Sequence, residues 1–269
     1  MDKFGYIRGR RGPPGPAGRD AVNIFTWFPF SALRMFRENS SCTFYFNTAD
    51  DGVLKKGQKP IGLKDRYGEL KRKSEVRNAI CLQNFQQPIK LPTGYYGISL
   101  KNSLYKISGA WLEAEVLPSI MVVAFSFKVA APLTQEDCYI FTNKDNTRGV
   151  TISKNSLNIL GSEERLELEY DIRNWNTLIL QYSFVTGPGK DQCFFELNGR
   201  RGFFKLHYDE KDNGEMYLGG HSEKRNFANV VLGNFEIYQK SFPLNPPHYV
   251  LPDGMIKVLN EDMAERIFP

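Results

Sequence analysis

Residues 193–208 read CFFELNGRRGFFKLHY, and this stretch predicts a β-hairpin. The strand-like run Cys193–Leu197 leads directly into the pair Asn198-Gly199. An Asn-Gly pair after such a run is a strong hairpin signal, because both turn residues must take positive φ. We therefore expect a returning strand over Phe203–Tyr208 that pairs across this turn.

Strand patterns recur along much of the remaining chain. In Met121–Val129 large apolar residues alternate with smaller or polar ones, which predicts a strand with one buried face. Leu166–Ile172 alternates apolar residues with charged ones, so its second face should meet water. Further strand-like runs are Thr177–Phe184, Met216–Leu218 and Val230–Tyr238. With turn residues between these runs and no long amphipathic helix, the pattern favours an all-β, two-sheet antiparallel sandwich.

Composition supports this fold class and restricts the partners. The chain has 269 residues, of which 41% are hydrophobic, and its 20 Phe and 13 Tyr suit strands better than helices. The formal net charge is +5, but residues 1–20 hold five basic and two acidic residues, so the rest carries only +2. That excess is too weak for a nucleic-acid domain. We also expect no membrane span, and the chain as given shows no signal peptide.

The N-terminus has a different character from the rest of the chain. Four consecutive Gly-X-Y triplets begin at Gly9, Gly12, Gly15 and Gly18. Glycine at every third position is what a collagen triple helix requires, because only glycine fits at its axis. We interpret residues 1–21 as a basic, collagen-like stem that joins three copies of the chain in a homotrimer. A flexible Pro/Gly-rich leader is the alternative interpretation.

Three other segments lack the strand pattern. Residues 22–39 are apolar and aromatic, and we interpret them as a neck beneath the sandwich. Residues 49–78 are rich in Lys, Arg, Gly and Asp, which predicts one long exposed loop or a pair of loops. Residues 243–269 form a Pro-rich C-terminal tail, in which the prolines exclude a central strand.

The cysteines show no metal-binding spacing. Cys42, Cys81, Cys138 and Cys193 lie far apart in the sequence, each in or beside an apolar run. We favour buried free thiols over disulfides, and Cys138–Cys193 is the first bridge to test. A single glycosylation sequon, at Asn39, is weak evidence of secretion.

Four motifs in the second half of the chain resemble a laminin-G-like, concanavalin-A-like domain. In chain order they are NWNTLIL at 174–180, FFELNG at 194–199, MYLGG at 216–220 and LGNFEIY at 232–238. Looser matches upstream extend the resemblance over residues 40–242. It implies a jelly-roll sandwich of two antiparallel sheets that binds glycans or protein surfaces through its rim loops.

The same resemblance implies a possible calcium site at the rim. Laminin-G-like domains often hold one Ca²⁺, which prefers hard oxygen ligands from carboxylates and carbonyls. No spacing singles out a ligand set, and turn-forming aspartates are the competing interpretation. The candidate ligands are Asp50, Asp51, Asp137, Asp145 and Asp191.

We find no catalytic residues in the sequence. Some concanavalin-like sandwiches are glycosidases that place carboxylates at every second position of one strand. Glu167, Glu169 and Asp171 begin this pattern, but Arg173 and Asn174 stand where the next acid is needed, so a solvated strand face is favoured. His207, His221 and His248 are isolated and form no triad pattern.

Clustered cations indicate a candidate site for sulfated or other acidic glycans. Arginine suits sulfate geometry, since its guanidinium can donate two parallel hydrogen bonds. An ordinary solvated loop is the competing interpretation. The candidate residues are Lys71, Arg72, Lys73 and Arg77, with Arg200 and Arg201 from the hairpin if the loops converge.

Together these features predict a non-enzymatic adhesion or receptor- and glycan-binding protein. We expect a homotrimeric, fibre-like molecule with lectin-like heads, placed on a virion surface or elsewhere outside cells. Trimerisation would multiply weak single-site affinity. Two alternatives stay open: a structural shell or matrix protein without a ligand, and a sandwich-fold glycosidase.

Overall fold

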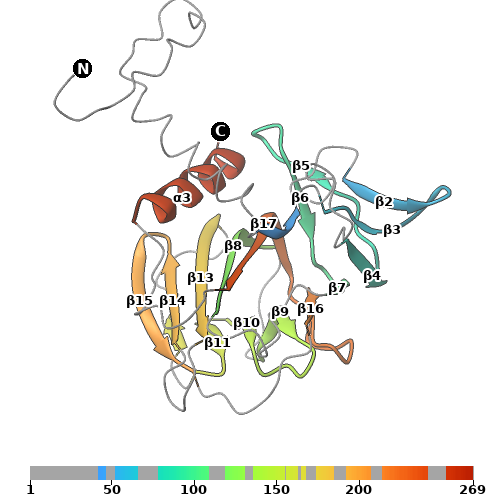
Figure 1. Cartoon of the computed structure of the whole chain (residues 1–269). Helices are drawn as coiled ribbons and strands as arrows, with labels where there is room; N and C mark the ends of the chain where they lie inside the picture. The colour runs from blue at the N-terminus through green and yellow to red at the C-terminus, as the bar shows by residue number, and fades with distance from the viewer. Residues whose placement is uncertain are drawn as a thin grey trace, which may run out of the picture.

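The structure is a computed structural model in which two antiparallel β-sheets pack face to face (Figure 1). Each sheet buries one face against the other and turns its second face outward. The residues that the structure describes are 42–46, 52–65, 78–108, 119–130, 136–154, 156–162, 165–167, 174–184, 192–206, 214–241 and 253–268. All statements about absence below concern these residues.

The first sheet, sheet I, contains eight strands. Its order is β15-β14-β13-β8-β17-β6-β5, and β1 pairs with β17 beside this path. The longest pairing joins β8 to β17 at its centre. The strand bounds are β1 Cys42–Phe46, β5 Ile89–Lys90, β6 Tyr96–Ser99, β8 Ser119–Val129, β13 Asn176–Phe184, β14 Gln192–Leu197, β15 Arg200–Lys205 and β17 Val230–Ser241.

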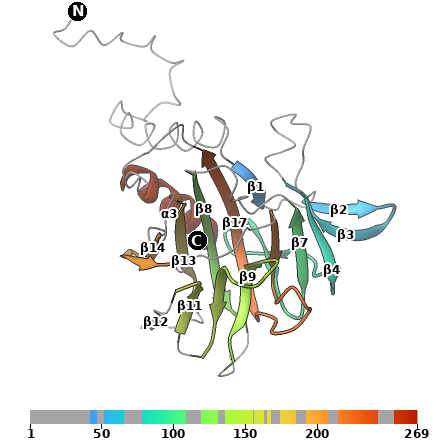
Figure 2. The same ribbon diagram turned by 60° about the horizontal axis from the view of Figure 1, so that its bottom comes forward.

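The second sheet, sheet II, contains nine strands in the order β12-β11-β10-β9-β16-β7-β4-β3-β2. The strands β2 and β3 form a hairpin that projects beyond the sandwich in both ribbon views (Figures 1 and 2). The bounds are β2 Val53–Lys56, β3 Lys59–Leu63, β4 Ala79–Gln83, β7 Leu104–Ser108, β9 Cys138–Asn143, β10 Gly149–Ile152, β11 Ser156–Leu160, β12 Arg165–Glu167 and β16 Glu215–Leu218.

The core between the sheets is aromatic at its centre. Phe125 from β8 packs edge-on against Phe141 from β9, with ring centroids 5.8 Å apart. Phe235 from β17 lies 5.6 Å from both rings, and all three side chains are fully buried. Edge-to-face aromatic pairs at such distances stabilise a core beyond their area burial. The aromatic content noted in the sequence therefore serves the junction between the sheets.

Several strands form where the sequence predicted them. The hairpin at Asn198-Gly199 joins β14 to β15, and the two turn residues have φ of 49° and 87°. The strands β8, β13, β16 and β17 match the predicted runs, with ends extended by one to three residues. The all-β, two-sheet prediction is therefore confirmed.

Two segments interpreted as loop and tail contain regular structure. The basic segment 49–78, expected to be loop, contains the β2–β3 hairpin, with Val53 and Leu63 buried at its base. The C-terminal tail contains a helix, α3, over Asp253–Ile267. Four prolines of the tail precede residue 253, so they do not prevent a helix that begins after them.

Helix α3 packs on the outer face of sheet I (Figure 1). Its buried residues Ile256, Leu259, Met263 and Ile267 follow at spacings of three and four, which place them on one helix face. Ile256, Leu259 and Met263 form a second apolar cluster with sheet residues from β8, β13, β14 and β17. Each such side chain contributes about 1.5–3 kcal/mol on full burial, so the helix is firmly attached.

Cys81, Cys138 and Cys193 are free thiols, so the structure contains no Cys138–Cys193 bridge. Burial raises the pKa of the Cys193 thiol, since the thiolate would lose its hydration. The predicted stem at 1–21, with Gly9, Gly12, Gly15 and Gly18, and the predicted neck at 22–39 lie outside the described residues. Within the described residues, no helix is long and apolar enough to span a bilayer.

Candidate functional site

The outer face of sheet II presents a mixed polar and apolar surface. A row of cross-strand neighbours runs over it from Ile80 in β4 to Lys106 in β7 and Tyr217 in β16. Leu82 stands on the same face of β4, two residues from Ile80. We call Ile80, Leu82, Lys106, Glu215 and Tyr217 the β7–β16 surface.

The polar centre of the β7–β16 surface is an ion pair. The Lys106 ammonium donates a hydrogen bond to Glu215, and both side chains are partly exposed, at 30% and 24%. The Tyr217 hydroxyl donates a second hydrogen bond to the Glu215 carboxylate, over 3.0 Å. The two donors hold this carboxylate in one orientation at the sheet surface.

The electrostatics of this centre follow from its hydrogen bonds. The Lys106 hydrogen bond is the largest cause that lowers the pKa of Glu215, and Tyr217 and the nearby Lys144 act in the same direction. Burial, together with the hydrogen bond to Glu215, raises the pKa of Tyr217 to about 12. Near neutral pH the surface therefore presents a carboxylate, an ammonium and a neutral phenol.

The β7–β16 surface also has an apolar part. Ile80 and Leu82 are each 40% exposed, although they belong to a sheet whose other face forms the core. Isolated exposed apolar residues need no explanation, but two on one strand beside an ordered ion pair form a mixed patch. Apolar surface with a few fixed polar groups is typical of ligand sites.

Two connecting loops form a rim beside this surface. The β9–β10 turn carries Asn146, which exchanges two hydrogen bonds with Ser222 of the β16–β17 loop, over 2.6 and 3.0 Å. His221 packs edge-on against Tyr139, with ring centroids 5.0 Å apart. Its Nδ1 accepts the backbone N–H of Glu223, over 3.1 Å. These contacts fix the loop against strand β9.

His221 is nearly buried in this rim, with 7% of its surface exposed. Desolvation, with a smaller effect from Arg225, lowers its pKa, although Glu223 acts in the opposite direction. The neutral imidazole is also the form that can accept a hydrogen bond at Nδ1. His221 therefore serves the loop conformation, and it has no nucleophile beside it among its described contacts.

Among the described residues, the outer face of sheet I carries two buried carboxylates, Glu196 and Glu236, which bear on the glycosidase alternative. Glu236 accepts the Tyr238 O–H and the Asn234 amide N–H. The Asn234 amide oxygen in turn accepts the N–H and O–H of Ser126, over 2.9 and 2.7 Å. These side chains form one buried hydrogen-bonded chain across β8 and β17.

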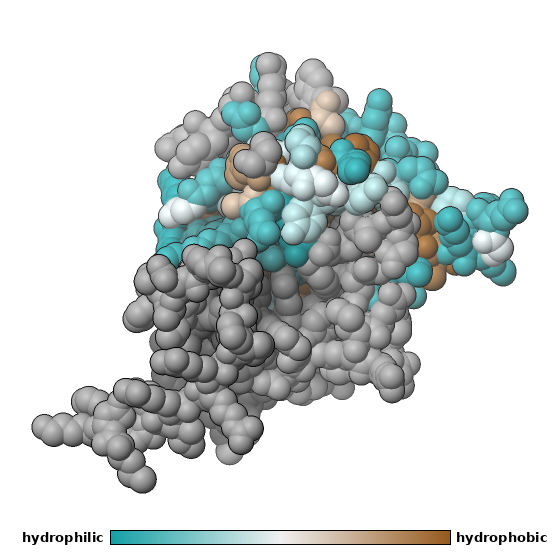
Figure 3. Space-filling model, turned by 90° about the horizontal axis from the view of Figure 1, so that it is seen from above, coloured by the Kyte–Doolittle hydropathy of each residue, from teal (hydrophilic) through white to brown (hydrophobic). Residues whose placement is uncertain are grey.

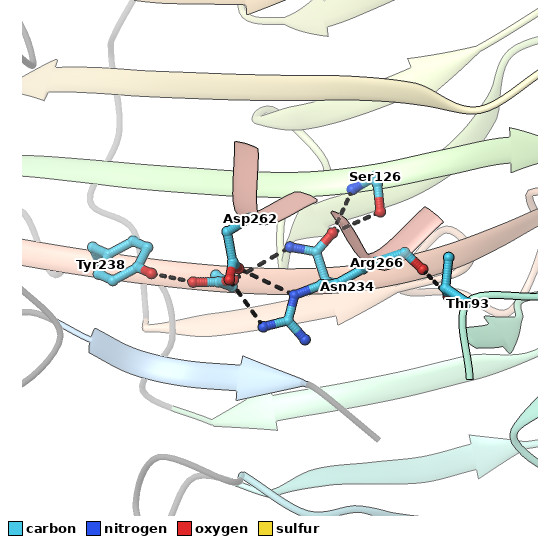
Figure 4. Close-up of polar contacts among 7 residues, drawn as sticks. Thr93, Ser126, Asn234, Tyr238, Asp262 and Arg266 are labelled. Carbon is cyan, nitrogen blue, oxygen red and sulfur yellow. Dashed lines mark hydrogen bonds and ion pairs between the residues drawn. The ribbon is translucent and has the colours of Figure 1, made fainter. Parts of the chain in front are cut away.

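Helix α3 attaches to this face through polar contacts as well. Arg266 and Asp262 form a nearly buried ion pair within the helix, at 3.1 Å, and the Arg266 carbonyl accepts the Thr93 O–H (Figure 4). Asn260 of the helix donates to Glu196 of β14, which also accepts from Arg201. The carboxylates here lie under the helix and hold structural hydrogen bonds, which is a different arrangement from two acids facing across a groove.

The predicted cationic patch is placed only in part. Arg200 and Arg201 are exposed at the start of β15, and the Arg201 guanidinium pairs with the buried Glu196. Lys71, Arg72, Lys73 and Arg77 lie outside the described residues. The strands that flank them, β3 and β4, stand at the opposite side of the molecule from β15 (Figure 1). Their role as one patch stays a prediction.

The predicted calcium ligands do not meet within the described residues. Asp137 pairs with Arg165 at 3.2 Å, whereas Asp145 is exposed in the β9–β10 turn. Asp50, Asp51 and Asp191 lie outside the described residues, as do Glu169, Asp171, His207 and His248. No group of three or more candidate metal ligands occurs in the part of the chain that the structure describes.

Sequence reasoning did not select the residues of the β7–β16 surface. Tyr217 belongs to a motif quoted for its family resemblance, yet its outward direction gives it the role described here. A signal was present: Lys106 interrupts the apolar run Leu104–Ile107, and the polar groups of Glu215 and Tyr217 alternate with Met216 and Leu218, although only 8% of Tyr217 is exposed. Such alternation marks an outward face, but only the sheet order brings β4, β7 and β16 together.

Solved structures share this fold, whereas no protein-family model and no characterised protein matches the sequence significantly. Botulinum neurotoxin type C, whose uptake by cells depends on two ganglioside molecules, aligns with a TM-score of 0.51 and 13% identity over 85% of this chain and 53% of that chain. The receptor binding domain of botulinum neurotoxin mosaic serotype C/D aligns with a TM-score of 0.49 and 14% identity, over 84% of this chain and 51% of that chain. The binding domain of botulinum neurotoxin DC, solved in complex with rat synaptotagmin II, aligns with a TM-score of 0.48 and 11% identity, over 86% of this chain and 52% of that chain.

The chain therefore spans about half the length of the structures that it resembles. At 13% identity the resemblance shows the fold, an antiparallel β-sandwich, and no more than the fold. Function has to be argued from the residues on this sandwich.

Proposed function

We propose that this chain is a non-enzymatic binding protein that recognises a glycan or another cell-surface receptor through the β7–β16 surface. The observation that carries the proposal is the Lys106–Glu215 pair, held at a sheet surface beside the exposed side chains of Ile80 and Leu82. The outer face of sheet I cannot serve in the same way where α3 covers it.

The chemistry of this surface suits a sugar. A sugar ring offers hydroxyl groups, which both donate and accept hydrogen bonds, and C–H faces, which are apolar. Glu215 can accept a hydrogen bond from a hydroxyl group, Lys106 can donate one to a hydroxyl oxygen, and Ile80 and Leu82 can contact the C–H face. Tyr217 acts as a positioning residue, because its hydroxyl orients the Glu215 carboxylate. Groups already fixed on a sheet lose little entropy on binding.

The structural neighbours support the same class of function. A botulinum neurotoxin that depends on gangliosides shares this fold, so such a sandwich is compatible with receptor recognition. The laminin-G-like motifs add a second, independent resemblance to recognition domains.

We further propose that the collagen-like triplets assemble three such heads into a fibre-like homotrimer on a virion or elsewhere outside cells. The triplets at Gly9, Gly12, Gly15 and Gly18 support this part of the proposal. Three linked heads would bind a multivalent surface far more tightly than one head does.

A glycan array with the full chain tests the recognition proposal. We expect specific binding that weakens in Lys106→Gln and in Glu215→Gln. The matched control is the exposed ion pair of α3, Lys257 with Glu261 at 3.8 Å, so that Lys257→Gln and Glu261→Gln should leave binding unchanged. A blank array would favour a structural shell or matrix protein, and release of sugar from labelled polysaccharides would favour the glycosidase.

The assembly proposal has its own test. Native mass spectrometry of the full chain and of a chain lacking residues 1–21 should show a trimer that depends on the stem. A trimer in both would place assembly in the head. A monomer in both would contradict the collagen-like interpretation, while leaving the glycan-binding result unaffected.

A further inference from the structure

The β2–β3 hairpin carries a second candidate binding site, at the tip of the projection. Figure 3 shows this projection with a mostly hydrophilic end. A two-residue turn, Gly57-Gln58, joins Lys56 to Lys59, and Gly57 has a φ of 63°. Glycine at the first turn position with positive φ is typical of a type II′ turn, which matches the twist of a hairpin. No atom lies within 4 Å of the position that a Gly57 Cβ would take, so the tip stands in open space.

The charges at this tip have one sign. Lys55, Lys56 and Lys59 are all exposed, and none of their side chains has an ion pair among the described residues. The sequence from Val53 to Lys64 contains four lysines and no acidic residue. The next acid, Asp65, is buried at the base of the hairpin, with 2% of its surface exposed. The chain therefore leaves the ammonium groups of Lys55, Lys56 and Lys59 available to a partner.

The register provides a second, independent observation. Lys56 and Lys59 stand directly opposite each other across the two strands. Like charges in that position destabilise a hairpin, because their side chains project from the same face about 5 Å apart. A bound anion placed between the two ammonium groups would remove this repulsion. The repulsive pair in the free protein thus prepares a site for an acidic group.

We propose that the tip of the β2–β3 hairpin, with Lys55, Lys56 and Lys59, binds the sulfate or carboxylate groups of an acidic glycan chain. This inference rests on the proposed recognition role, but it names a different part of the molecule and a different ligand chemistry. Lys56 and Lys59 hold one acidic group between them on one face of the hairpin, and Lys55, on the other face, meets a neighbouring group where the glycan chain bends around the tip.

A glycan fits this tip better than the other polyanions do. Insertion into a membrane interface needs apolar or aromatic side chains, and the tip sequence KKGQK has none. Single-stranded nucleic acid is held by aromatic stacking platforms, which are also missing from residues 55–59. A flexible acidic polysaccharide needs only clustered cations on an accessible projection, and the hairpin provides these.

Affinity for heparin, measured by calorimetry with the full chain at several salt concentrations, tests the inference. We expect the triple variant Lys55→Gln, Lys56→Gln, Lys59→Gln to bind about tenfold more weakly than the parent protein. The matched control removes three exposed lysines elsewhere, with Lys101→Gln, Lys154→Gln and Lys205→Gln, and should keep most of the affinity. Circular dichroism verifies that both variants remain folded.

Further outcomes separate this site from the β7–β16 surface. The pair Lys56→Arg, Lys59→Arg should retain or improve heparin affinity, since guanidinium groups hold sulfate well. Equal losses in the hairpin variant and its control, unchanged binding to heparin that has been both desulfated and carboxyl-reduced, or no heparin binding at all would each overturn the inference. So would binding to phosphatidylserine vesicles that is stronger than binding to heparin. Neutral-glycan binding through Lys106 and Glu215 would survive each of these results, so the two proposals fail independently.

Discussion

The outer faces of the two sheets differ in what they do with their polar residues. On sheet I a cross-strand row runs from Arg201 through Glu196, Ile179 and Ala124 to Glu236, and helix α3 packs over this face. On sheet II the row from Ile80 through Lys106 to Tyr217 lies beside Glu215, and the Lys106–Glu215 ion pair is partly exposed. Both rows place carboxylates beside donors, but only the first row lies under a helix.

This difference separates stability from recognition. A buried carboxylate that loses its donors leaves an unpaired charge, so the contacts under α3 contribute strongly to folding. An exposed ion pair contributes little to stability, and its groups remain available to a ligand. The same residue types therefore serve the fold on one face, and on the other they form the ion pair of the proposed binding surface.

Removal of one leucine side chain from each face gives the largest expected contrast. Leu259 of α3 is 1% exposed, whereas Leu82 of β4 is 40% exposed. We expect Leu259→Ala to lower the free energy of unfolding by about 2–5 kcal/mol, because it leaves a cavity in the second apolar cluster. Leu82→Ala should cost less than about 1 kcal/mol. Urea unfolding of the two variants measures both changes in the free energy of unfolding, and their m-values show whether unfolding exposes the same surface. Equal losses of stability would contradict the division between the faces.

Loss of a buried acceptor gives the next largest effect. Glu236 is 1% exposed and accepts the Tyr238 O–H and the Asn234 amide. Glu236→Ala should lower the free energy of unfolding by about 1–3 kcal/mol, since both donors would lose their acceptor inside the protein. Glu236→Gln keeps one acceptor oxygen and should cost less. The thermal midpoints of the two variants provide the test, and a neutral Glu236→Ala would show that water reaches this face.

The strands that the sequence predicted well carry local signals. Asn198-Gly199 fixes its own turn chemistry, and Val230–Tyr238 has enough apolar residues to form a central strand in any sheet order. These features depend on neighbours in the sequence. The two-sheet architecture could be predicted from them because each strand must bury one face.

The elements that were missed depend on contacts distant in sequence or on weak local patterns. In the β2–β3 hairpin only Val53 of β2 and the last two residues of β3 are buried, and the lysines give the segment the composition of a solvated loop. The sequence contains the helical spacing of Ile256, Leu259, Met263 and Ile267. It follows four prolines, however, and their composition is typical of an irregular tail. The β7–β16 surface follows from strand order, which no local pattern reveals.

Acid should weaken the rim loop more than the sheets. The pKa of His221 is lowered in the folded protein, mainly by desolvation, so the unfolded chain binds a proton more readily. The stability that the neutral ring provides is complete above its unfolded pKa of about 6.5 and decreases as pH falls below that value. Protonation would also put a proton on Nδ1, where the Glu223 N–H is accepted.

The test compares the parent protein with His221→Asn between pH 7.5 and pH 5, a range of about one pH unit or more on each side of the unfolded value. The variant should be less stable at pH 7.5, and it should lose less stability than the parent as pH falls. Amide hydrogen exchange in residues 219–226 locates the effect. Parallel decreases in both proteins would assign the acid sensitivity to other groups.

The smallest expected effect on stability belongs to the surface ion pair, and for that reason it is the most informative about function. Lys106 lowers the pKa of Glu215, so the pair contributes stability above the ordinary glutamate pKa and loses it as pH falls through the lowered value. Because both side chains are partly exposed, Lys106→Gln should change the free energy of unfolding at pH 7 by less than about 1 kcal/mol.

The same variant should lose most of its affinity for the glycan found on the array. Calorimetric unfolding and glycan titration of one protein preparation measure both quantities. A variant that loses stability and affinity together would make the pair a part of the fold, whereas lost affinity at unchanged stability would assign it to the ligand.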